Sequence, residues 1–409
     1  MNAAFRRGAC PSLSAPMETG DGLLVRLRPA NGALVPRQLA GTAEAAMRHG
    51  NGILEITARG NLQIRGVTEA SVARLRQDIA TLDIAAREGV SVETGPLAGL
   101  DAAEIADPRP VVEAIRRGAD GLGLAMRLGP KVSVIVDGGG ALAMPSIPAD
   151  VRLEATADGP VARWRVTIGG SSAQLLADCD AGQAVRTTLS ILSHLAAKGR
   201  EARARDVRAS EIPELGGLSH PVSLGAAATP VHPAGQFRLK DGNEATGFCL
   251  AFGQTTGRQM IAFAEAAEGA REIRLSHGRG MLVLGPPASH LGALAEVARR
   301  LDLVTERDDP RLRIVVCAGA PACASAHLAT RSLAAEIAAD RPGLLEQTVQ
   351  LHLSGCQKRC AQPQGPTVTL VGRDGGCDLT AEGATVTAST RAFLVGRADR
   401  YLLAGTERH

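Results

Sequence analysis

The alternation of hydrophobic and polar positions divides the chain into two similar stretches. In the first stretch, alternation predicts strands at 22–28, 53–57 and 61–66. Helical spacing predicts helices at 36–49 and 69–82. Val72, Leu75, Ile79 and Leu82 recur at steps of three and four residues, so they share one face of the last helix. That face is expected to pack on a sheet.

The second stretch repeats this order of elements later in the chain. Strands are predicted at 247–252, 271–275 and 280–284, and helices at 257–268 and 288–302. The local sequence repeats as well, because ITARGNLQIRG resembles LSHGRGMLVLG when Arg59 is aligned with Arg279. A duplicated split βαβ unit is therefore expected.

Each unit is followed by a longer stretch of α/β character. A strand at 131–137 and a helix at 181–198 are predicted after the first unit, and a strand at 311–317 and a helix at 323–338 after the second. The segment between the halves is rich in Arg, Ala, Pro and Gly and is typical of a linker.

The predicted fold class is α+β, with two pseudo-symmetric halves. Each half combines a small ferredoxin-like unit with a larger α/β core. The predicted boundaries are 18–85 for the first unit, 90–198 for the first core, 199–235 for the linker, 236–303 for the second unit and 304–409 for the second core.

Composition narrows the classes of function. The 409 residues are 45% hydrophobic and 21% charged, with a net charge of +3, which is typical of a globular protein. Six Phe, one Trp and one Tyr, with so little net charge, disfavour nucleic-acid binding. No apolar run reaches the roughly 18 residues of a membrane span, and no apolar signal region follows Arg7, so a cytoplasmic location is expected.

Four cysteines form two pairs in the last quarter of the chain. Cys317 and Cys323 have five residues between them, Cys356 and Cys360 have three, and each pair begins where an apolar run ends. Neighbouring strand ends would bring four thiolates together, as a [4Fe–4S] cluster requires. Structural zinc and buried unreactive thiols are the alternatives. The cysteines without ligand spacing, which are expected to be core thiols, are Cys10, Cys179, Cys249 and Cys377.

The repeat, the cysteine pairs and the sequence TARGNLQIRG together resemble the nitrite and sulfite reductase family. TGPLAGLD at 94–101 is similar to the family's segment after its first unit. The resemblance covers most of the chain. It implies a reductase-type core with a [4Fe–4S] cluster at the four cysteines, beside a siroheme whose iron Cys360 also reaches. It implies further that Arg59 helps to hold the substrate anion.

Two positions depart from the reductase pattern. Val90 stands where the reductases carry another anion-binding arginine, and their lysine pair appears here as Lys131 and Ser133. Reduction of sulfite or nitrite develops negative charge at the bound anion, so a site without these cations suits it poorly. A siroheme-dependent nitrite or sulfite reductase is therefore the second hypothesis. A non-catalytic tetrapyrrole or zinc protein is the third.

One branch of the family shares more of the sequence. The opening from Arg6 to Pro29, PKVSVIVDGG at 130–139 and SGCQKRCAQP at 354–363 resemble the precorrin-3B synthases of aerobic cobalamin biosynthesis. That resemblance implies a monooxygenase that uses O₂ and NADH-derived electrons. The reaction it implies is hydroxylation of precorrin-3A at C20 with formation of a γ-lactone. It also implies a mononuclear non-haem iron in place of siroheme.

A tetrapyrrole with several carboxylates needs cations around it, and arginine binds carboxylates through two hydrogen bonds. Arg59, Arg65 and Lys131 are the candidate substrate-binding residues, in a cleft between the halves. Arg59 is favoured by its place in a turn beside Gly60, whereas Arg65 could equally face solvent from its strand. Arg279, the counterpart of Arg59 in the repeat, is expected at the surface.

The sequence does not identify ligands for a mononuclear iron. No HxD or HxxxH pattern occurs. His327, on the helix predicted after Cys323, and His352, on the strand before Cys356, are more typical of polar core positions. Gly138–Gly140 follow a strand without completing a dinucleotide fingerprint. Electrons are therefore expected from NADH through a separate donor protein, with direct transfer from NADH as the alternative.

Overall fold

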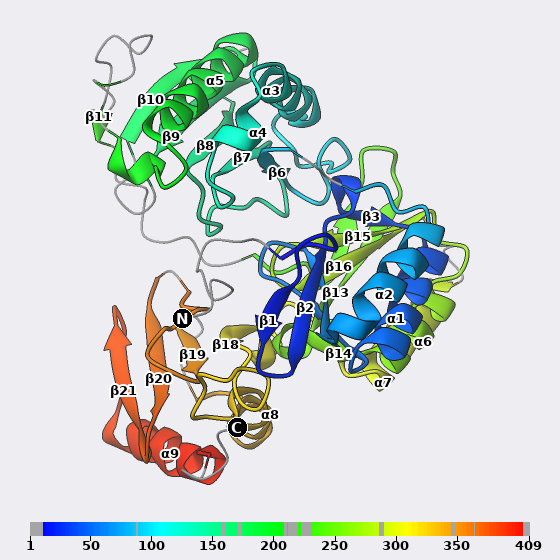
Figure 1. The fold of residues 1–409 in the computed structure, drawn as a ribbon, viewed down its shortest axis with the longest axis vertical. Helices are drawn as coiled ribbons and strands as arrows, with labels where there is room; N and C mark the ends of the chain where they lie inside the picture. The colour runs from blue at the N-terminus through cyan, green and yellow to red at the C-terminus, as the bar shows by residue number, and fades with distance from the viewer. Residues whose placement is uncertain are drawn as a thin grey trace.

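The computed structural model describes residues 11–403, apart from 87–88, 158–160, 170–173, 208–210, 212–219, 222–230, 286–289, 345–348 and 364. In this part of the chain, four β-sheets carry the fold. The sheets of the two repeats lie in one body, a six-stranded sheet forms a second lobe and a four-stranded sheet a third (Figure 1). Cys10 and the start of the chain lie outside the described residues.

The first unit has the predicted order of elements. Its strands pair in the order β1-β2-β5-β4, all antiparallel. Leu75 and Ile79 of the last helix are buried, as their spacing predicts, and a capping box between Thr68 and Ser71 starts that helix. The elements are β1 (Met17–Thr19), β2 (Gly22–Leu27), α1 (Pro36–His49), β4 (Ile53–Ile56), β5 (Leu62–Val67) and α2 (Glu69–Thr81).

The second unit reproduces this arrangement. Its strands pair in the order β12-β13-β16-β15, and β17 (Leu303–Val304) pairs with β13 as well. A capping box between Thr256 and Gln259 starts its first helix. The other elements are β12 (Gly235–Arg238), β13 (Glu244–Leu250), α6 (Gly257–Ala266), β15 (Glu272–Ser276), β16 (Gly280–Leu284) and α7 (Leu291–Arg300).

The two units exchange one short strand each. β3 (Ala33–Leu34) leaves the first unit to pair with β15, and β14 (Gln254–Thr256) leaves the second to pair with β4. Each short strand follows a 3₁₀ turn with a positive φ at its centre, 53° at Asn31 and 55° at Phe252. The exchange is thus the same in both directions.

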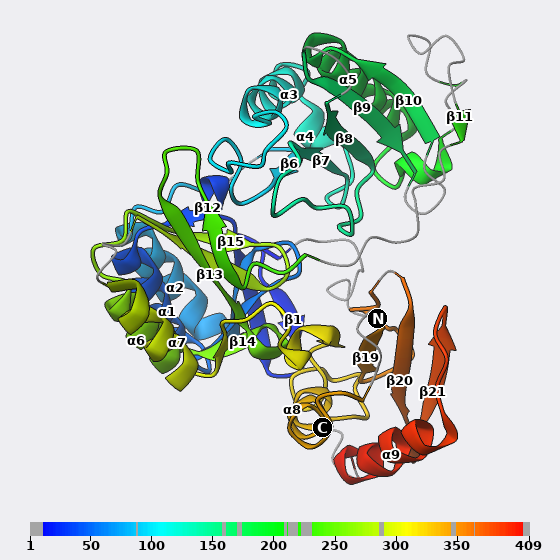
Figure 2. The same cartoon turned by 180° about the vertical axis from the view of Figure 1, so that it is seen from behind.

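One hydrophobic core spans both units. Leu39 and Leu54 of the first unit belong to the same buried cluster as Phe248 and Phe263 of the second. Helices α1, α2, α6 and α7 lie together on one side of this body (Figures 1 and 2). The segments 18–85 and 236–303 are therefore one folding body, although the sequence separates them by a lobe.

The first α/β lobe has a six-stranded sheet in the order β11-β10-β9-β8-β7-β6, of which β6, β7 and β8 are parallel. All five residues of β7 are buried, which explains the apolar run at 131–137. The elements are β6 (Ser91–Thr94), α3 (Arg109–Gly121), α4 (Leu124–Arg127), β7 (Ser133–Asp137), β8 (Val151–Thr156), β9 (Arg163–Ile168), β10 (Gln174–Cys179), α5 (Ala181–Lys198) and β11 (His220–Pro221). Part of the expected linker, β11, thus completes this sheet.

The C-terminal lobe has a four-stranded sheet in the order β18-β19-β20-β21, in which the first three strands are parallel. Its helix begins at Thr330, later than the predicted 323, because the residues after Cys323 form turns instead: the N–H of Ala326 donates to the carbonyl of Cys323, and that of His327 donates across to the carbonyl of Gly355. His327 therefore lies in a loop. The elements are β18 (Ile314–Val316), α8 (Thr330–Asp340), β19 (Gln350–Ser354), β20 (Thr367–Arg373), β21 (Gly376–Glu382) and α9 (Ala388–Ala398).

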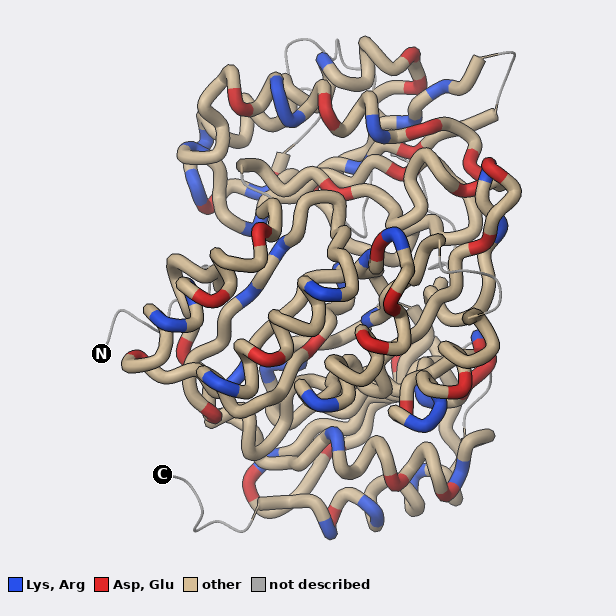
Figure 3. Tube along the Cα trace, turned by 90° about the vertical axis from the view of Figure 1, so that its right-hand side faces the viewer, with Lys and Arg blue, Asp and Glu red and all other residues tan. Residues whose placement is uncertain are grey.

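Charges are mixed over the molecule. Lys and Arg alternate with Asp and Glu along the trace in Figure 3, in keeping with the small net charge. Among the described residues, no helix has the length and apolar character needed to cross a membrane.

Candidate active site

The turns after β4 and β15 meet at the middle of the two-unit body. Arg59 and His277 form an isolated antiparallel bridge, and the N–H of Gly278 donates to the carbonyl of Ala58 at 3.1 Å. The duplication therefore places the two equivalent turns against each other, which is how the motif around Arg59 comes to face its own repeat.

Gly60 is required at this contact. Its φ is +74°, and a Cβ atom there would lie 2.7 Å from the backbone carbon of Ser276. We expect Gly60→Ala to destabilise the protein by clearly more than the roughly 1–2 kcal/mol of left-handed strain alone. Gly375→Ala is the matched control, because its φ is +68° and nothing lies within 4 Å. Urea unfolding of both variants measures the difference, and equal losses would contradict the tight contact.

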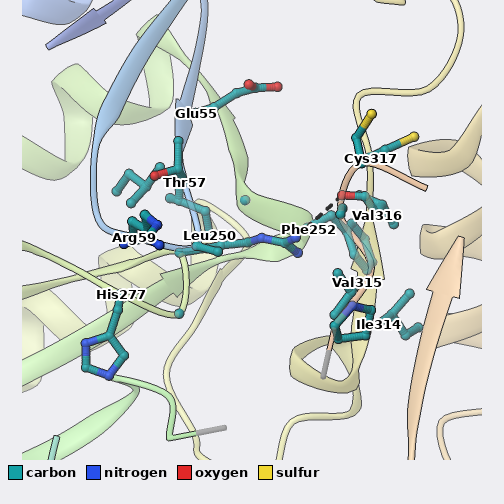
Figure 4. Close-up of a pocket in the computed structure, with 18 of the residues that line it drawn as sticks. Glu55, Thr57, Arg59, Leu250, Phe252, His277, Ile314, Val315, Val316 and Cys317 are labelled. Atoms are coloured by element: carbon teal, nitrogen blue, oxygen red, sulfur yellow. Dashed lines mark hydrogen bonds between the residues drawn. The ribbon is translucent and has the colours of Figure 1, made fainter. Parts of the chain in front are cut away.

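A cavity of about 540 Å³ lies beside the facing turns and extends to the C-terminal lobe. Glu55, Thr57 and Arg59 stand on one side of it and Cys317 on the other (Figure 4). Among the described residues that line it, one is acidic, Glu55, and the basic ones are Arg26, Arg59, Arg65, Arg279, Arg311 and Arg331. The cavity is thus an arginine-rich space between the halves, where the sequence predicts a cleft.

Arg65 is buried, with 2% of its surface exposed, so it does not face solvent from its strand. Its guanidinium donates to Asp21 at 2.7 and 2.9 Å and to the carbonyl of Ala322 at 2.8 Å, and lies 3.4 Å from Glu55. Burial by itself would raise the pKa of Asp21, but the bonds and charge of Arg65 lower it overall. Arg65 therefore connects the first unit to the loop that carries Cys323.

Arg59 keeps part of its side chain open, with 32% exposed. Its Nη1 atom donates to Glu93 at 2.9 Å, and its Nη2 atom donates to the carbonyl of Pro148. Both partners belong to the first α/β lobe, so Arg59 bridges that lobe and the cavity. Lys131 is exposed and lies outside the lining of the cavity, so its predicted contact with substrate stays a prediction.

Arg279 differs from the expectation of a surface position. It is partly buried, lines the cavity, and points its Nη2 atom at the carbonyl of Val316, 3.5 Å away. Burial and the nearby charge of Arg331 lower its pKa to about 10. A turn arginine is usually solvated, but here the start of the C-terminal lobe covers the turn, and that packing is not visible in the local sequence.

The two loops that carry the cysteine pairs converge at one edge of the C-terminal sheet. β18 and β19 are parallel, so Cys317 and Cys356, which follow them, start from the same end. The N–H of Gly355 donates to Cys317 Sγ at 3.1 Å. A Cβ atom on Gly355 would lie 3.3 Å from the Cα atom of Gly319, so the two loops are in close contact.

All four cysteines are free thiols, and Cys317 and Cys360 line the cavity. Among the described residues, no three His, Cys, Asp or Glu side chains gather closely enough to hold one metal ion. The ligands of a [4Fe–4S] cluster bind four different iron atoms and lie further apart. Four thiols on facing loops, with a backbone N–H already directed at one sulfur, fit such a cluster.

The described residues offer no set of two histidines and one carboxylate for a mononuclear iron. His232 and His277 line the cavity, and neither ring nitrogen of His277 has a hydrogen-bond partner in the described part of the chain. His352 is buried on β19, where its Nδ1 atom pairs with Gln362 at 2.9 Å. The backbone N–H of His327 donates to the carbonyl of Gly355.

The cavity histidines make stability depend on pH. Burial lowers the pKa of both His232 and His277 to about 4, against about 6.5 in an unfolded chain. The unfolded state therefore binds more protons between pH 6.5 and 4, and stability falls there by up to about 1.4 kcal/mol per pH unit for each histidine. Urea unfolding between pH 7 and 4.5 should show a smaller slope for His277→Gln. An unchanged slope would contradict this assignment.

The remaining described cysteines lie in a hydrophobic core or pack against one. Cys249 is fully buried, Cys179 packs against the core of the first lobe and Cys377 against that of the C-terminal lobe. Burial raises the pKa of each thiol, which suits the unreactive role expected from their lack of ligand spacing.

Comparison with known proteins defines the class first. The family model of the nitrite/sulfite reductase ferredoxin-like half domain matches residues 15–82. The solved structure of the Mycobacterium tuberculosis NirA protein has a TM-score of 0.71, with 21% identity over 88% of this chain and 73% of that one. A ferredoxin–nitrite reductase of Synechococcus elongatus is 24% identical over 87% of this chain and 77% of its own length. The fold is thus that of the nitrite and sulfite reductases, which confirms the predicted fold class.

A precorrin-3B synthase from a Sinorhizobium species is more similar in sequence. It is 39% identical over 93% of this chain and 84% of its own length. The chain belongs to the precorrin-3B synthase family, as the motifs in its sequence indicate.

Proposed function

We propose that this protein is an oxygen-dependent monooxygenase of aerobic cobalamin biosynthesis. The reaction is conversion of precorrin-3A to precorrin-3B, by hydroxylation at C20 with formation of a γ-lactone. Membership of the precorrin-3B synthase family supports the substrate. The observation in the structure that carries the proposal is the arginine-rich cavity bordered by two of the four paired cysteines.

The chemistry of the cavity suits a tetrapyrrole. The macrocycle is broad and apolar, whereas its acid side chains are at the edge, so its site needs apolar walls and peripheral cations. Ile56, Leu250 and Phe252 line the cavity together with the arginines. Arg59, partly open and in the facing turn, binds a substrate carboxylate. Arg65 contributes by holding the wall and the Cys323 loop in place.

The cofactors proposed are a [4Fe–4S] cluster at Cys317, Cys323, Cys356 and Cys360 and a mononuclear non-haem iron, for which the described residues identify no ligands. When bound, the cluster supplies single electrons, which O₂ chemistry at a ferrous centre requires. Because Cys317 and Cys360 line the cavity, a cluster held by these cysteines would supply electrons beside the space proposed for the substrate. NADH is the source of the electrons, directly or through a reductase, and the cytoplasm is the proposed location.

Metal, sulfide and pigment analysis of anaerobically purified protein tests this proposal, with visible spectra before and after dithionite. About four sulfides, somewhat more than four irons and no siroheme bands are expected. Incubation with precorrin-3A, reductant and ¹⁸O₂ should then place one labelled oxygen atom in the product. Siroheme bands would instead favour a nitrite or sulfite reductase. Zinc without sulfide would favour a non-catalytic metal-binding protein.

A further inference from the structure

Arg279 is the cavity arginine that the described residues leave without a carboxylate partner. Among the described residues, its side chain makes one hydrogen-bond contact, with the carbonyl of Val316 at 3.5 Å, which is long for such a bond. Arg26 also has an interaction partner, so it is not a second unpaired arginine of the cavity. The other pairs are Arg59–Glu93, Arg65–Asp21, Arg65–Glu55, Arg311–Asp309 and Arg331–Glu55.

The backbone around Arg279 is built to present this side chain. Arg279 has a φ of +64°, a conformation that costs free energy for any residue with a Cβ atom. Gly253 provides the room, because a Cβ atom there would lie 2.7 Å from Cδ of Arg279. A partly buried cation to which no carboxylate of the described residues is hydrogen-bonded is costly as well. The positive φ and the cation without a hydrogen-bonded carboxylate both cost free energy at one cavity residue. This indicates that a bound ligand with a negative charge compensates the cost.

We infer that Arg279 binds an acid side chain of the tetrapyrrole substrate, as the counterpart of Arg59 in the second repeat. This inference rests on the proposed function and names the group that the second half recognises. Arg59 and Arg279 occupy the equivalent turns of the two repeats, and both line the cavity. A pseudo-symmetric pair of arginines matches a ligand that carries carboxylates around its edge, and arginine can bind each one through two hydrogen bonds.

An alternative role for Arg279 is to stabilise the thiolate of Cys317. Cys317 follows Val316, the residue whose carbonyl Arg279 contacts. In that role, loss of the guanidinium would change the reduction potential of the cluster and would leave the affinity for a tetrapyrrole unchanged. In the role that we infer, the affinity changes.

The test uses Arg279→Gln and Arg279→Lys, with uroporphyrin III as a stable tetrapyrrole that carries eight carboxylates. Quenching of its fluorescence on titration with holoprotein gives Kd. Arg279→Gln should raise Kd about 10- to 100-fold, and Arg279→Lys, which keeps the charge, should raise it less. Arg274→Gln is the matched control: Arg274 lies on β15, bonds to Pro96 and Glu272, and is not among the lining residues.

A second readout separates binding from a structural role. Because the unpaired cation is costly in the free protein, Arg279→Gln should leave the Tm of ligand-free protein equal or higher, while a structural arginine would lower it. Equal Kd values for wild type and Arg279→Gln, or a changed cluster potential with unchanged Kd, would overturn the inference and leave the proposed function standing. Failure of the wild-type protein to bind uroporphyrin III would overturn both.

Discussion

Replacement of Arg65 by methionine is expected to lower the free energy of unfolding by about 3–5 kcal/mol. The guanidinium is 2% exposed and lies between Asp21 and Glu55, so its removal leaves two carboxylates in a confined space without their cation. The variant also loses the bond to Ala322, next to Cys323. We therefore expect less cluster per chain as well as lower stability. Urea unfolding and sulfide analysis measure the two effects.

The control for Arg65 is Arg74→Met on the exposed face of α2, which should change stability by less than about 0.5 kcal/mol. Adding Asp21→Asn to Arg65→Met removes one of the stranded charges and should restore part of the loss. If Asp21→Asn does not relieve the loss of stability, packing rather than charge carries the effect of Arg65→Met. Equal losses for Arg65→Met and Arg74→Met would contradict the prediction.

Replacement of Cys356 by serine is expected to remove most of the iron and acid-labile sulfide, and the conversion of precorrin-3A with them. A serine hydroxyl is a poor ligand for a [4Fe–4S] cluster, and electron delivery depends on that cluster. Cys377→Ser is the matched control, because Cys377 is another partly buried free cysteine of the same lobe, without ligand spacing. Iron and sulfide at wild-type levels in Cys356→Ser would contradict the ligand assignment.

Local patterns were sufficient to predict most elements of the two units. The helix predicted at 36–49 has those bounds, and the strand predicted at 280–284 does too. These elements form from residues close in sequence, whose apolar spacing records which face is buried. The exchanged strands β3 and β14 could not be predicted, because they are two and three residues long and their partners lie in the other half.

In the site, too, features that depend on neighbouring residues could be predicted, whereas contacts between distant segments could not. The cysteine pairs could be found from spacing, since each loop is contiguous. The burial of Arg65 could not, because Asp21 and Ala322 come from distant segments of the chain. Arg279 was wrongly expected at the surface for the same reason: its cover comes from the strand before Cys317. The repeat predicted that Arg279 lies in the turn equivalent to that of Arg59, but it did not predict that the C-terminal lobe covers this turn.

The reciprocal strand exchange bears on the origin of the chain. β3 completes the sheet of the second repeat and β14 completes that of the first, through equivalent positions in both. This is the geometry of a two-fold symmetric dimer in which each subunit lends an edge strand to its partner. Gene fusion of such a dimer converts an isologous interface into an intramolecular one. In a chain of this kind the two copies can diverge: in one turn the positive φ falls on Gly60, and in the other it falls on Gly278 and Arg279.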